Sequence, residues 1–381
     1  MLFKFKKIGL LLICLVFSIY KGRAVKKINS PKKILIIQMA KLGDMVCTTP
    51  MFRAVKNKYP NVELIVVGNK INKDILNGDK NVDKYLVFDG LLSVFKKIKK
   101  EKIDFACITS PDFISLCILY LANIKTIVVP EIKNGYSPYE IKEYKILRKF
   151  VLKSDYKMGF YAPREYLKLL EPIDVFTSNT KKYLYFSENA NKKTNDYFTK
   201  NQINKNKDLI IGISPSAGNK IKKWSGCKFA EIVAYVYKKY SAKIIIIGAK
   251  RDEKEVEEMI NFLDEDIQFF NSLNMFNIDE LKALVSKMDL FISVDTGPIY
   301  IAEAFDVATI DIVGPMDENE QPPVGKVHRV VIVSDRKKPE LHIMNARRYN
   351  KEEARRQIDE ITAKMVIKEI DYLLSILCDK K

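Results

Sequence analysis

Short apolar runs alternate with amphipathic segments along most of the chain, from about residue 31 to residue 333. Runs such as residues 34–37 are apolar at every position, which is typical of parallel strands covered on both faces. In the first half, the pattern predicts strands at 34–39, 62–67, 84–88, 103–109 and 126–129, with helices near 50–58, 91–99 and 112–122. This order indicates a parallel sheet wound by right-handed crossovers.

A polar stretch rich in Asn and Lys, at about 177–207, interrupts this alternation and predicts a domain boundary with a connecting strand and a surface helix. The alternation then restarts, with strands near 209–214, 243–248, 267–270, 289–293, 308–313 and 329–333, and helices near 226–239, 251–262, 278–287 and 297–305. We therefore expect two Rossmann-like doubly wound α/β domains, at 31–180 and 181–345. An amphipathic pattern over about 351–378 predicts a C-terminal helix, within 346–381, that packs back across the domains.

The charge of the chain is concentrated at its N-terminus. The formal net charge is +18, and no acidic residue precedes Asp44, whereas nine basic residues lie within the first 33 positions: Lys4, Lys6, Lys7, Lys21, Arg23, Lys26, Lys27, Lys32 and Lys33. They flank an uncharged apolar run at 8–20, which is shorter than the roughly 20 residues that span a bilayer as a helix.

Three interpretations of residues 1–30 compete. A cleaved export signal is suggested by the triplet Gly22-Arg23-Ala24, and a solvated basic tail with a buried apolar patch is the plainest alternative. A membrane-surface or partly inserted anchor fits both basic flanks, and basic residues after the run favour the cytoplasmic side. We therefore expect association with the inner face of the cytoplasmic membrane. Nucleic-acid binding is not expected, because the basic residues are not interleaved with stacking aromatic residues.

The composition also argues against two kinds of active site. The six cysteines are scattered and form no Cys-x-x-Cys pair, and the apolar surroundings of Cys14, Cys107 and Cys117 predict small buried thiols in a reducing compartment. The two histidines, His328 and His342, lie outside the strong motifs. Neither a metal centre nor a Ser-His-Asp triad is expected.

Three turns at strand ends carry the candidate chemistry. Asp44 follows the first strand, at the strand end where α/β sheets bind ligands. It could take a proton from an attacking hydroxyl, or it could simply cap a helix that starts at Pro50, and position alone gives the two readings equal weight. The second turn, residues 214–218, offers Ser216 and backbone amides to a phosphate and is followed by Lys222 and Lys223; a surface turn with solvated lysines is its plain alternative.

The third turn, Asp295-Thr296-Gly297-Pro298, follows a strand and opens a helix. Exposed amides and a hydroxyl at a helix N-terminus suit a diphosphate, although a simple helix cap would use the same residues. The acidic run Asp264-Glu265-Asp266 looks like a metal-binding motif, but it lies between a helix and a strand and predicts a solvated loop.

The chain resembles glycosyltransferase family 9, the lipopolysaccharide heptosyltransferase family, over nearly all of residues 32–375. Four stretches carry the resemblance by their order and spacing: residues 34–60, 211–231, 281–304 and 314–317. It implies the GT-B architecture, with two Rossmann-like domains facing a central cleft, and an inverting transfer without a catalytic metal or other cofactor. The nucleotide sugar enters as a substrate, and ADP-heptose is one candidate donor. The acceptor would be an anionic glycolipid or polysaccharide.

The resemblance also implies roles for single residues. Asp44 would be the general base, Lys222 would neutralise donor phosphate, and Asp295, Thr296 and Gly297 would contact the donor sugar and diphosphate. The ribose-binding acid would be Glu253, with Asp252 nearly as suitable. Two departures bear on the donor: Tyr300 stands where family members commonly carry His, and Ala217-Gly218 replaces a small polar pair.

The sequence therefore predicts a membrane-associated glycosyltransferase acting on a cell-surface glycan. Two other classes stay open: a catalytically silent protein that binds a sugar nucleotide or glycolipid, and a general binder of anionic surfaces.

Overall fold

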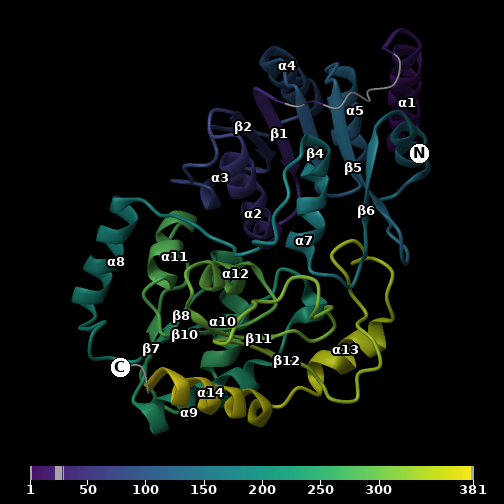
Figure 1. The fold of residues 1–381 in the computed structure, drawn as a ribbon. Helices are drawn as coiled ribbons and strands as arrows, with labels where there is room; N and C mark the ends of the chain where they lie inside the picture. The colour runs from purple at the N-terminus through teal and green to yellow at the C-terminus, as the bar shows by residue number, and fades with distance from the viewer. Residues whose placement is uncertain (1, 22–27, 29, 379–381) are drawn as a thin grey trace. The chain divides into compact units, whose positions relative to one another are not determined.

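The structure is a computed structural model that describes residues 2–21, 28 and 30–378. The chain divides into two compact units, one made of residues 1–181 and 343–348 and the other of residues 182–342 and 349–381 (Figure 1). Each unit contains one parallel six-stranded sheet with helices packed against it. The predicted fold class, two doubly wound α/β units, is confirmed.

The sheet of the first unit has the strand order β3-β2-β1-β4-β5-β6. Its strands are β1 (Lys33–Gln38), β2 (Glu63–Gly68), β3 (Lys84–Val87), β4 (Phe105–Ile108), β5 (Thr126–Ile132) and β6 (Leu152–Tyr156). Its helices are α1 (Leu2–Lys21), α2 (Leu42–Lys58), α3 (Lys70–Ile75), α4 (Leu91–Glu101), α5 (Phe113–Leu121), α6 (Lys142–Leu147) and α7 (Ala162–Leu167), with short 3-10 turns η1 (Arg148–Phe150) and η2 (Lys168–Ile173). The direction of the strand order reverses between the neighbouring strands β1 and β4, so the topological switch point lies at the carboxyl ends of these two strands.

The sheet of the second unit has the order β12-β11-β10-β7-β8-β9. Its strands are β7 (Ile210–Ser214), β8 (Lys243–Ile246), β9 (Phe270–Asn271), β10 (Leu290–Val294), β11 (Ala308–Ile312) and β12 (His328–Val331). Its helices are α8 (Glu188–Lys200), α9 (Gly226–Tyr240), α10 (Glu253–Ile260), α11 (Ile278–Val285), α12 (Gly297–Ala304), α13 (Lys351–Asp359) and α14 (Ala363–Cys378), with 3-10 turns η3 (Lys220–Lys222) and η4 (Lys250–Asp252). Here the switch point lies between β7 and β10, the two strands that precede the second and third turns.

Helix α2 begins at Leu42, well before the predicted start near Pro50, which lies inside the helix. Proline has no N–H to donate to the carbonyl of Val46, four residues earlier. The helix tolerates Pro50 because the hydroxyl of Thr49 donates to that carbonyl instead, at 2.8 Å. Asp44 is consequently the third residue of the helix and does not belong to a preceding loop.

The boundary region contains the predicted surface helix, α8, but residues 175–187 form neither helix nor strand, so the predicted connecting strand is wrong. Four elements of the first unit, α3, α6, α7 and β6, have no counterpart among the predicted elements. Each is short, and β6, at the sheet edge, alternates partly buried and exposed residues before the buried Tyr156, so it lacks the continuous apolar run that marks a central strand.

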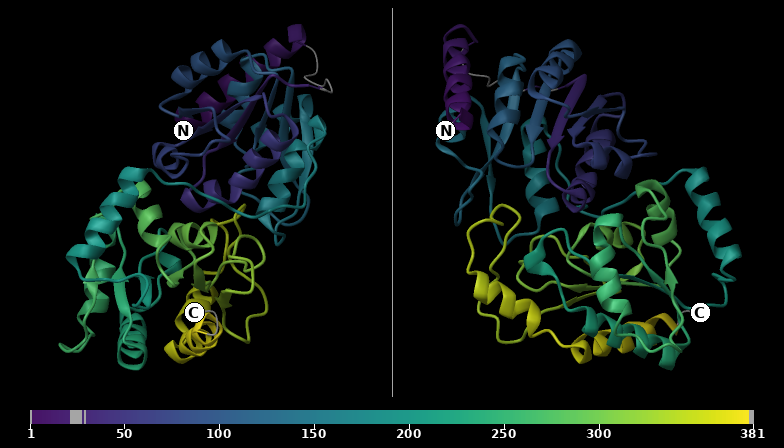
Figure 2. Two further views of the ribbon diagram at one scale, coloured as in Figure 1. Left: turned by 60° about the vertical axis from the view of Figure 1, so that its left-hand side comes forward. Right: turned by 180° about the vertical axis from the view of Figure 1, so that it is seen from behind.

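The C-terminal segment forms two helices, α13 and α14, whose apolar residues belong to the core of the second unit. Ile358, Ile361, Val366, Ile370 and Leu373 are fully buried in that core. Helix α14 lies along α9 at the foot of Figures 1 and 2. This placement differs from the expected helix packing back across the domains, because the amphipathic pattern shows that one face is buried and does not show against which partner.

The predicted apolar run lies inside helix α1, which has 20 residues and also carries lysines at both ends; α1 (purple in Figure 2) packs against α5 and α6. No helix in the described part of the chain is both long enough and apolar enough to cross a membrane. The triplet at 22–24, which suggested the alternative of a cleaved export signal, lies outside the described residues.

Candidate functional site

In the first unit, Asp44 lies at the switch point, one turn into the helix that follows the central strand β1. Its carboxylate accepts the backbone N–H of Lys41 at 3.1 Å, as the third helical residue often does at a helix start. The side chain is only partly buried, so the carboxylate combines a capping contact with access to solvent. The two readings of Asp44, cap and base, are therefore compatible.

Three amide side chains hold the turn before Asp44. The side-chain amide of Gln38, 1% exposed, donates to Thr48 Oγ1 at 3.0 Å and accepts the N–H of Ala40 at 3.0 Å. Asn69 and Asn72 each donate to the carbonyl of Ala40 at 2.9 Å. The sequence analysis did not include these positioning residues, although all three are polar residues at or just after the ends of β1 and β2.

In the second unit, the second and third turns meet at the switch point between β7 and β10. Lys222, in η3, donates to the carboxylate of Asp295 at 2.8 Å and to its backbone carbonyl at 2.5 Å. The pair is mostly buried, with side-chain exposures of 16% and 8%. The structure thus brings together Lys222, which the sequence predicts to bind phosphate, and the carboxylate of the third turn, 73 residues away in sequence.

The hydroxyl of Tyr300 donates to the other carboxylate oxygen of Asp295, so the carboxylate is held from two sides. The ring of Tyr300 also contacts a second lysine. The Nζ atom of Lys182 lies 5.6 Å from the centroid of this ring and forms an ion pair with Glu303 of α12 at 2.6 Å. Asp311, 1% exposed on β11, lies in the same cluster: burial first, and then the charge of Asp295, raises its pKa well above the usual range. With Asp311 neutral, the positive charges of Lys182 and Lys222 are matched by the negative charges of Glu303 and Asp295.

Three other residues predicted to bind the sugar-nucleotide donor belong to the second and third turns themselves. Ser216 is buried in the turn after β7, and Thr296 is the N-cap residue of α12, with no hydrogen bond from its side chain to the helix. Gly297 is the first residue of α12, whose N-terminal amides lack intrahelical partners. Hydroxyls and amides at the positive end of a helix dipole form a suitable anion site.

Trp224 anchors the second turn in the core of the unit. Its ring packs edge-on against Phe229, with ring centroids 4.9 Å apart, and its indole N–H donates to the carbonyl of Ile361 at 2.9 Å. This contact ties the turn to the segment between α13 and α14.

The two candidates for the ribose-binding acid differ in their surroundings. The carboxylate of Asp252 accepts the N–H of Ala249 at 2.8 Å and so caps η4, whereas Glu253 is an exposed side chain at the start of α10. This difference favours Glu253 as a ligand. The acidic run Asp264-Glu265-Asp266 forms an exposed turn before β9, as the sequence predicted.

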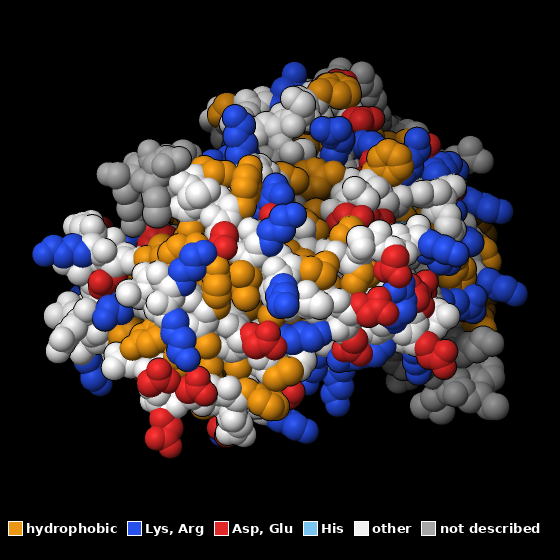
Figure 3. Space-filling model, turned by 90° about the horizontal axis from the view of Figure 1, so that it is seen from below, with side chains coloured by type: hydrophobic (Ala, Val, Ile, Leu, Met, Phe, Trp, Pro, Cys, Tyr) orange, Lys and Arg blue, Asp and Glu red, His pale blue; other side chains and the backbone are white. Residues whose placement is uncertain are grey.

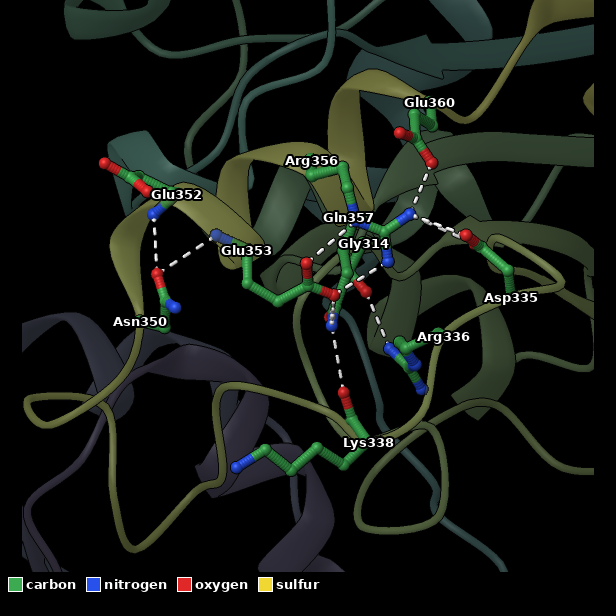
Figure 4. A network of polar contacts seen from close by, with 10 residues as sticks. All are labelled: Gly314, Asp335, Arg336, Lys338, Asn350, Glu352, Glu353, Arg356, Gln357 and Glu360. Carbon is green, nitrogen blue, oxygen red and sulfur yellow. Dashed lines mark hydrogen bonds and ion pairs between the residues drawn. The ribbon is translucent and has the colours of Figure 1, made fainter.

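A network around α13 fixes the loop that follows β11 (Figure 4). Arg336 donates to the carbonyls of Gly314 and Met316 at 2.7 and 2.8 Å, and Gln357 donates to the carbonyl of Lys338 at 2.9 Å. Gly314 has a φ of +55°, and a Cβ there would lie 2.7 Å from the side chain of Ile358. The motif at 314–317 therefore has a backbone conformation that requires glycine.

Asp317, Glu320 and His342 each offer a potential metal-ligand atom, all within 4.8 Å of one another. The His342 Nδ1 atom lies 3.2 Å from Asp317 and 3.3 Å from Glu320. The adjacent carboxylates, Asp317 first and then Glu320, raise the pKa of His342 to about 9, so at pH 7 the protonated imidazole forms an ion triad with them.

This triad predicts a pH-dependent stability. Because the pKa of His342 is raised in the folded protein, its contribution is fully present below about pH 6.5 and is lost as the pH rises through about 9. We expect His342→Gln to lower the free energy of unfolding by about 2 kcal/mol at pH 6 and by much less at pH 9.5. Urea unfolding at the two pH values measures this difference, and an equal loss at both would contradict a charged His342.

Positive and negative side chains are mixed on the face of the molecule seen in Figure 3. Lys and Arg side chains there are interspersed with Asp, Glu and apolar side chains. A nucleic-acid footprint normally gathers basic residues into one patch or stripe. This face therefore gives no support to general binding of nucleic acid.

The sequence profile described as "Glycosyltransferase family 9 (heptosyltransferase)" matches residues 93–350. The chain belongs to glycosyltransferase family 9. It is 25% identical over 291 residues to "Lipooligosaccharide heptosyltransferase 2" of Campylobacter jejuni, an alignment that covers 74% of this chain and 82% of that protein. The family assignment makes the protein a glycosyltransferase.

Solved structures of family 9 enzymes share the fold. A glycosyltransferase family 9 protein of Veillonella parvula superposes with a TM-score of 0.75 at 18% identity, covering 90% of this chain and 97% of that one. The ADP-heptose lipopolysaccharide heptosyltransferase II of E. coli superposes with a TM-score of 0.70 at 17% identity, covering 92% and 100%. The GT-B assignment of this glycosyltransferase follows from these neighbours.

Proposed function

We propose that this family 9 enzyme transfers a heptose or a related sugar from a nucleotide sugar to a lipopolysaccharide-type acceptor, with inversion and without a metal. ADP-heptose is the first donor to test, because the named relatives are a lipooligosaccharide heptosyltransferase and an ADP-heptose lipopolysaccharide heptosyltransferase. The acceptor would be an anionic glycolipid or polysaccharide. The reaction would take place at the cytoplasmic side of the membrane that carries this acceptor.

The contact between Lys222 and Asp295 at the N-terminus of α12 carries this proposal. The ammonium group of Lys222, the amides near Gly297 and the hydroxyl of Thr296 would stabilise negative charge on the departing nucleoside diphosphate. These groups supply positive charge of the kind that a metal ion provides in other transferases. Asp295, oriented by Lys222 and Tyr300, would hold the sugar, and Glu253 would hold the ribose.

Asp44 would act on the acceptor. As the acceptor hydroxyl oxygen forms a bond to the anomeric carbon, the bond from that carbon to the diphosphate oxygen breaks, and its electron pair leaves with the nucleoside diphosphate. The hydroxyl proton passes to the Asp44 carboxylate. A single displacement of this kind inverts the anomeric configuration and requires one base and no enzyme nucleophile.

A thermal-shift screen against ADP-, GDP-, UDP- and dTDP-sugars tests donor binding, since a ligand stabilises the folded state in proportion to its affinity. Release of nucleoside diphosphate with a matched acceptor tests transfer, and NMR of the product tests inversion. Transfer that is lost with EDTA and restored by a divalent cation would contradict the metal-independent mechanism. Donor binding without turnover across acceptors would instead favour the catalytically silent protein.

We expect Lys222→Met to lower kcat/KM for the donor by about 10- to 100-fold, the value of a charge-assisted hydrogen bond to phosphate. The matched control is Lys223→Met, which removes the neighbouring lysine and its ion pair with Glu255. Initial rates at varied donor concentration give the comparison. Equal losses in the two variants would mean that Lys222 has no special role.

A further inference from the structure

One face of α1 belongs to the core of the first unit. Leu11 and Cys14 are 7% and 0% exposed, and the ring of Phe17 packs edge-on against Tyr120 with centroids 6.2 Å apart. The thiols of Cys14 and Cys117 are hydrogen-bonded to each other between α1 and α5. Inserting α1 across a bilayer would strip this face from the core, and cleaving it off would expose α5 and α6.

The opposite face of α1 carries five large apolar side chains with little cover. They form what we call the α1 stripe: Ile8 (42% exposed), Leu12 (57%), Ile13 (58%), Val16 (57%) and Ile19 (79%). At 100° per helical residue, these side chains lie within an arc of about 140°, opposite the buried face. A contiguous apolar surface of this kind marks a binding surface.

Charge decides between the occupants of the stripe. The first 33 residues carry nine basic residues and no acidic residue, so a second copy of the chain would bring two strongly positive segments together. An anionic lipid surface would instead attract the same segments and accept the apolar side chains among its head groups and upper acyl chains. The combination of an apolar stripe and an acid-free basic flank fits lipid better than self-association.

We propose that α1 docks the enzyme on an anionic membrane surface through the α1 stripe, with the helix lying in the plane of the membrane while its other face stays in the protein core. The inference rests on the membrane location in the proposed function, but it does not rest on the reaction. It names a binding surface and its partner: a bilayer rich in acidic phospholipid.

Flotation of the full chain with lipid vesicles tests the proposal. We expect binding to vesicles containing 25% phosphatidylglycerol, weaker binding at high salt, and little binding to pure phosphatidylcholine. The triple variant Leu12→Gln, Val16→Gln, Ile19→Gln removes the centre of the stripe and should lower partitioning at least tenfold. Transfer to a water-soluble acceptor fragment should be unchanged, so failure of docking and failure of the reaction are distinguishable.

A matched control carries the same number of apolar-to-glutamine changes at exposed sites outside α1: Leu92→Gln, Phe176→Gln and Phe262→Gln, which are 70%, 70% and 61% exposed. It should bind vesicles as the wild type does. Undiminished binding by the stripe variant, or equal losses in both variants, would overturn the proposal. A concentration-dependent dimer of the wild type that the stripe variant loses would assign the stripe to a second copy.

The depth of α1 provides an independent readout. In Val16→Trp, the new indole lies in the stripe, whereas the native Trp224 is buried in the second unit and 4% exposed. Lipids brominated near the head group should quench the new indole more strongly than lipids brominated near the acyl end. Stronger quenching from the bilayer centre would indicate insertion and contradict in-plane docking.

Discussion

Asp44→Asn is expected to lower kcat by about 10²- to 10⁴-fold, the usual contribution of a general base, with little change in donor affinity. Asparagine keeps an oxygen that can accept the N–H of Lys41, so the start of α2 is preserved while the base is removed. The measurement is release of nucleoside diphosphate at saturating donor and acceptor, with donor binding followed by thermal shift.

The matched control for this change is Asp112→Asn. Asp112 caps α5 in the same unit and accepts the N–H of Ser115 at 2.8 Å, a structural role without a proposed chemical one. We expect this variant to retain nearly full activity. Full activity of Asp44→Asn would mean that Asp44 only caps α2 and that the acceptor proton goes elsewhere.

The sequence predicts the central strands and the second and third turns well, because both depend on local pattern, whereas it places the start of the helix that carries Asp44 too late. A central strand such as β1 is a continuous apolar run, and the turn with Asp295 follows directly from the strand before it. The convergence of Lys222 and Asp295 follows from topology: β7 and β10 are neighbours in the sheet although far apart in the chain. The roles of Glu253 and Ser216 remain predictions, since they concern a ligand.

Contacts that join distant segments could not be predicted. Tyr300 appeared only as a departure from the family pattern, and the structure shows its hydroxyl holding Asp295. Lys182 lies in a lysine-rich boundary segment that reads as solvent-exposed, yet its side chain is fully buried. A local pattern contains no information about a partner 121 residues away, so a buried lysine and an exposed one look alike in sequence.

Lys182→Met is expected to destabilise the second unit by about 3–5 kcal/mol at pH 8, because it leaves Glu303 as an unpaired buried carboxylate. The side chains of Lys182 and Glu303 are 0% and 6% exposed, and Glu303 also accepts the N–H of Val324 at 3.1 Å. Urea unfolding followed by fluorescence of Trp224, the only tryptophan, reports on this unit directly.

The pH dependence of this loss distinguishes a buried charge from a simple packing defect. Burial already raises the pKa of Glu303 with Lys182 present, and removing the lysine should raise it further. A folded-state pKa above the unfolded one penalises the folded state as the pH rises through that interval, so the loss should be smaller at pH 5 than at pH 8.

Two further variants separate the ion pair from its surroundings. The double variant Lys182→Met, Glu303→Gln should recover most of the stability, since glutamine removes the charge and keeps an acceptor for Val324. Lys193→Met breaks the exposed pair with Glu280, in which the lysine is 47% exposed, and should cost less than about 1 kcal/mol. The contrary outcome is that Lys182→Met loses the same free energy of unfolding at both pH values, without recovery in the double variant. That result would show that packing of the lysine side chain, rather than its charge, stabilises this part of the second unit.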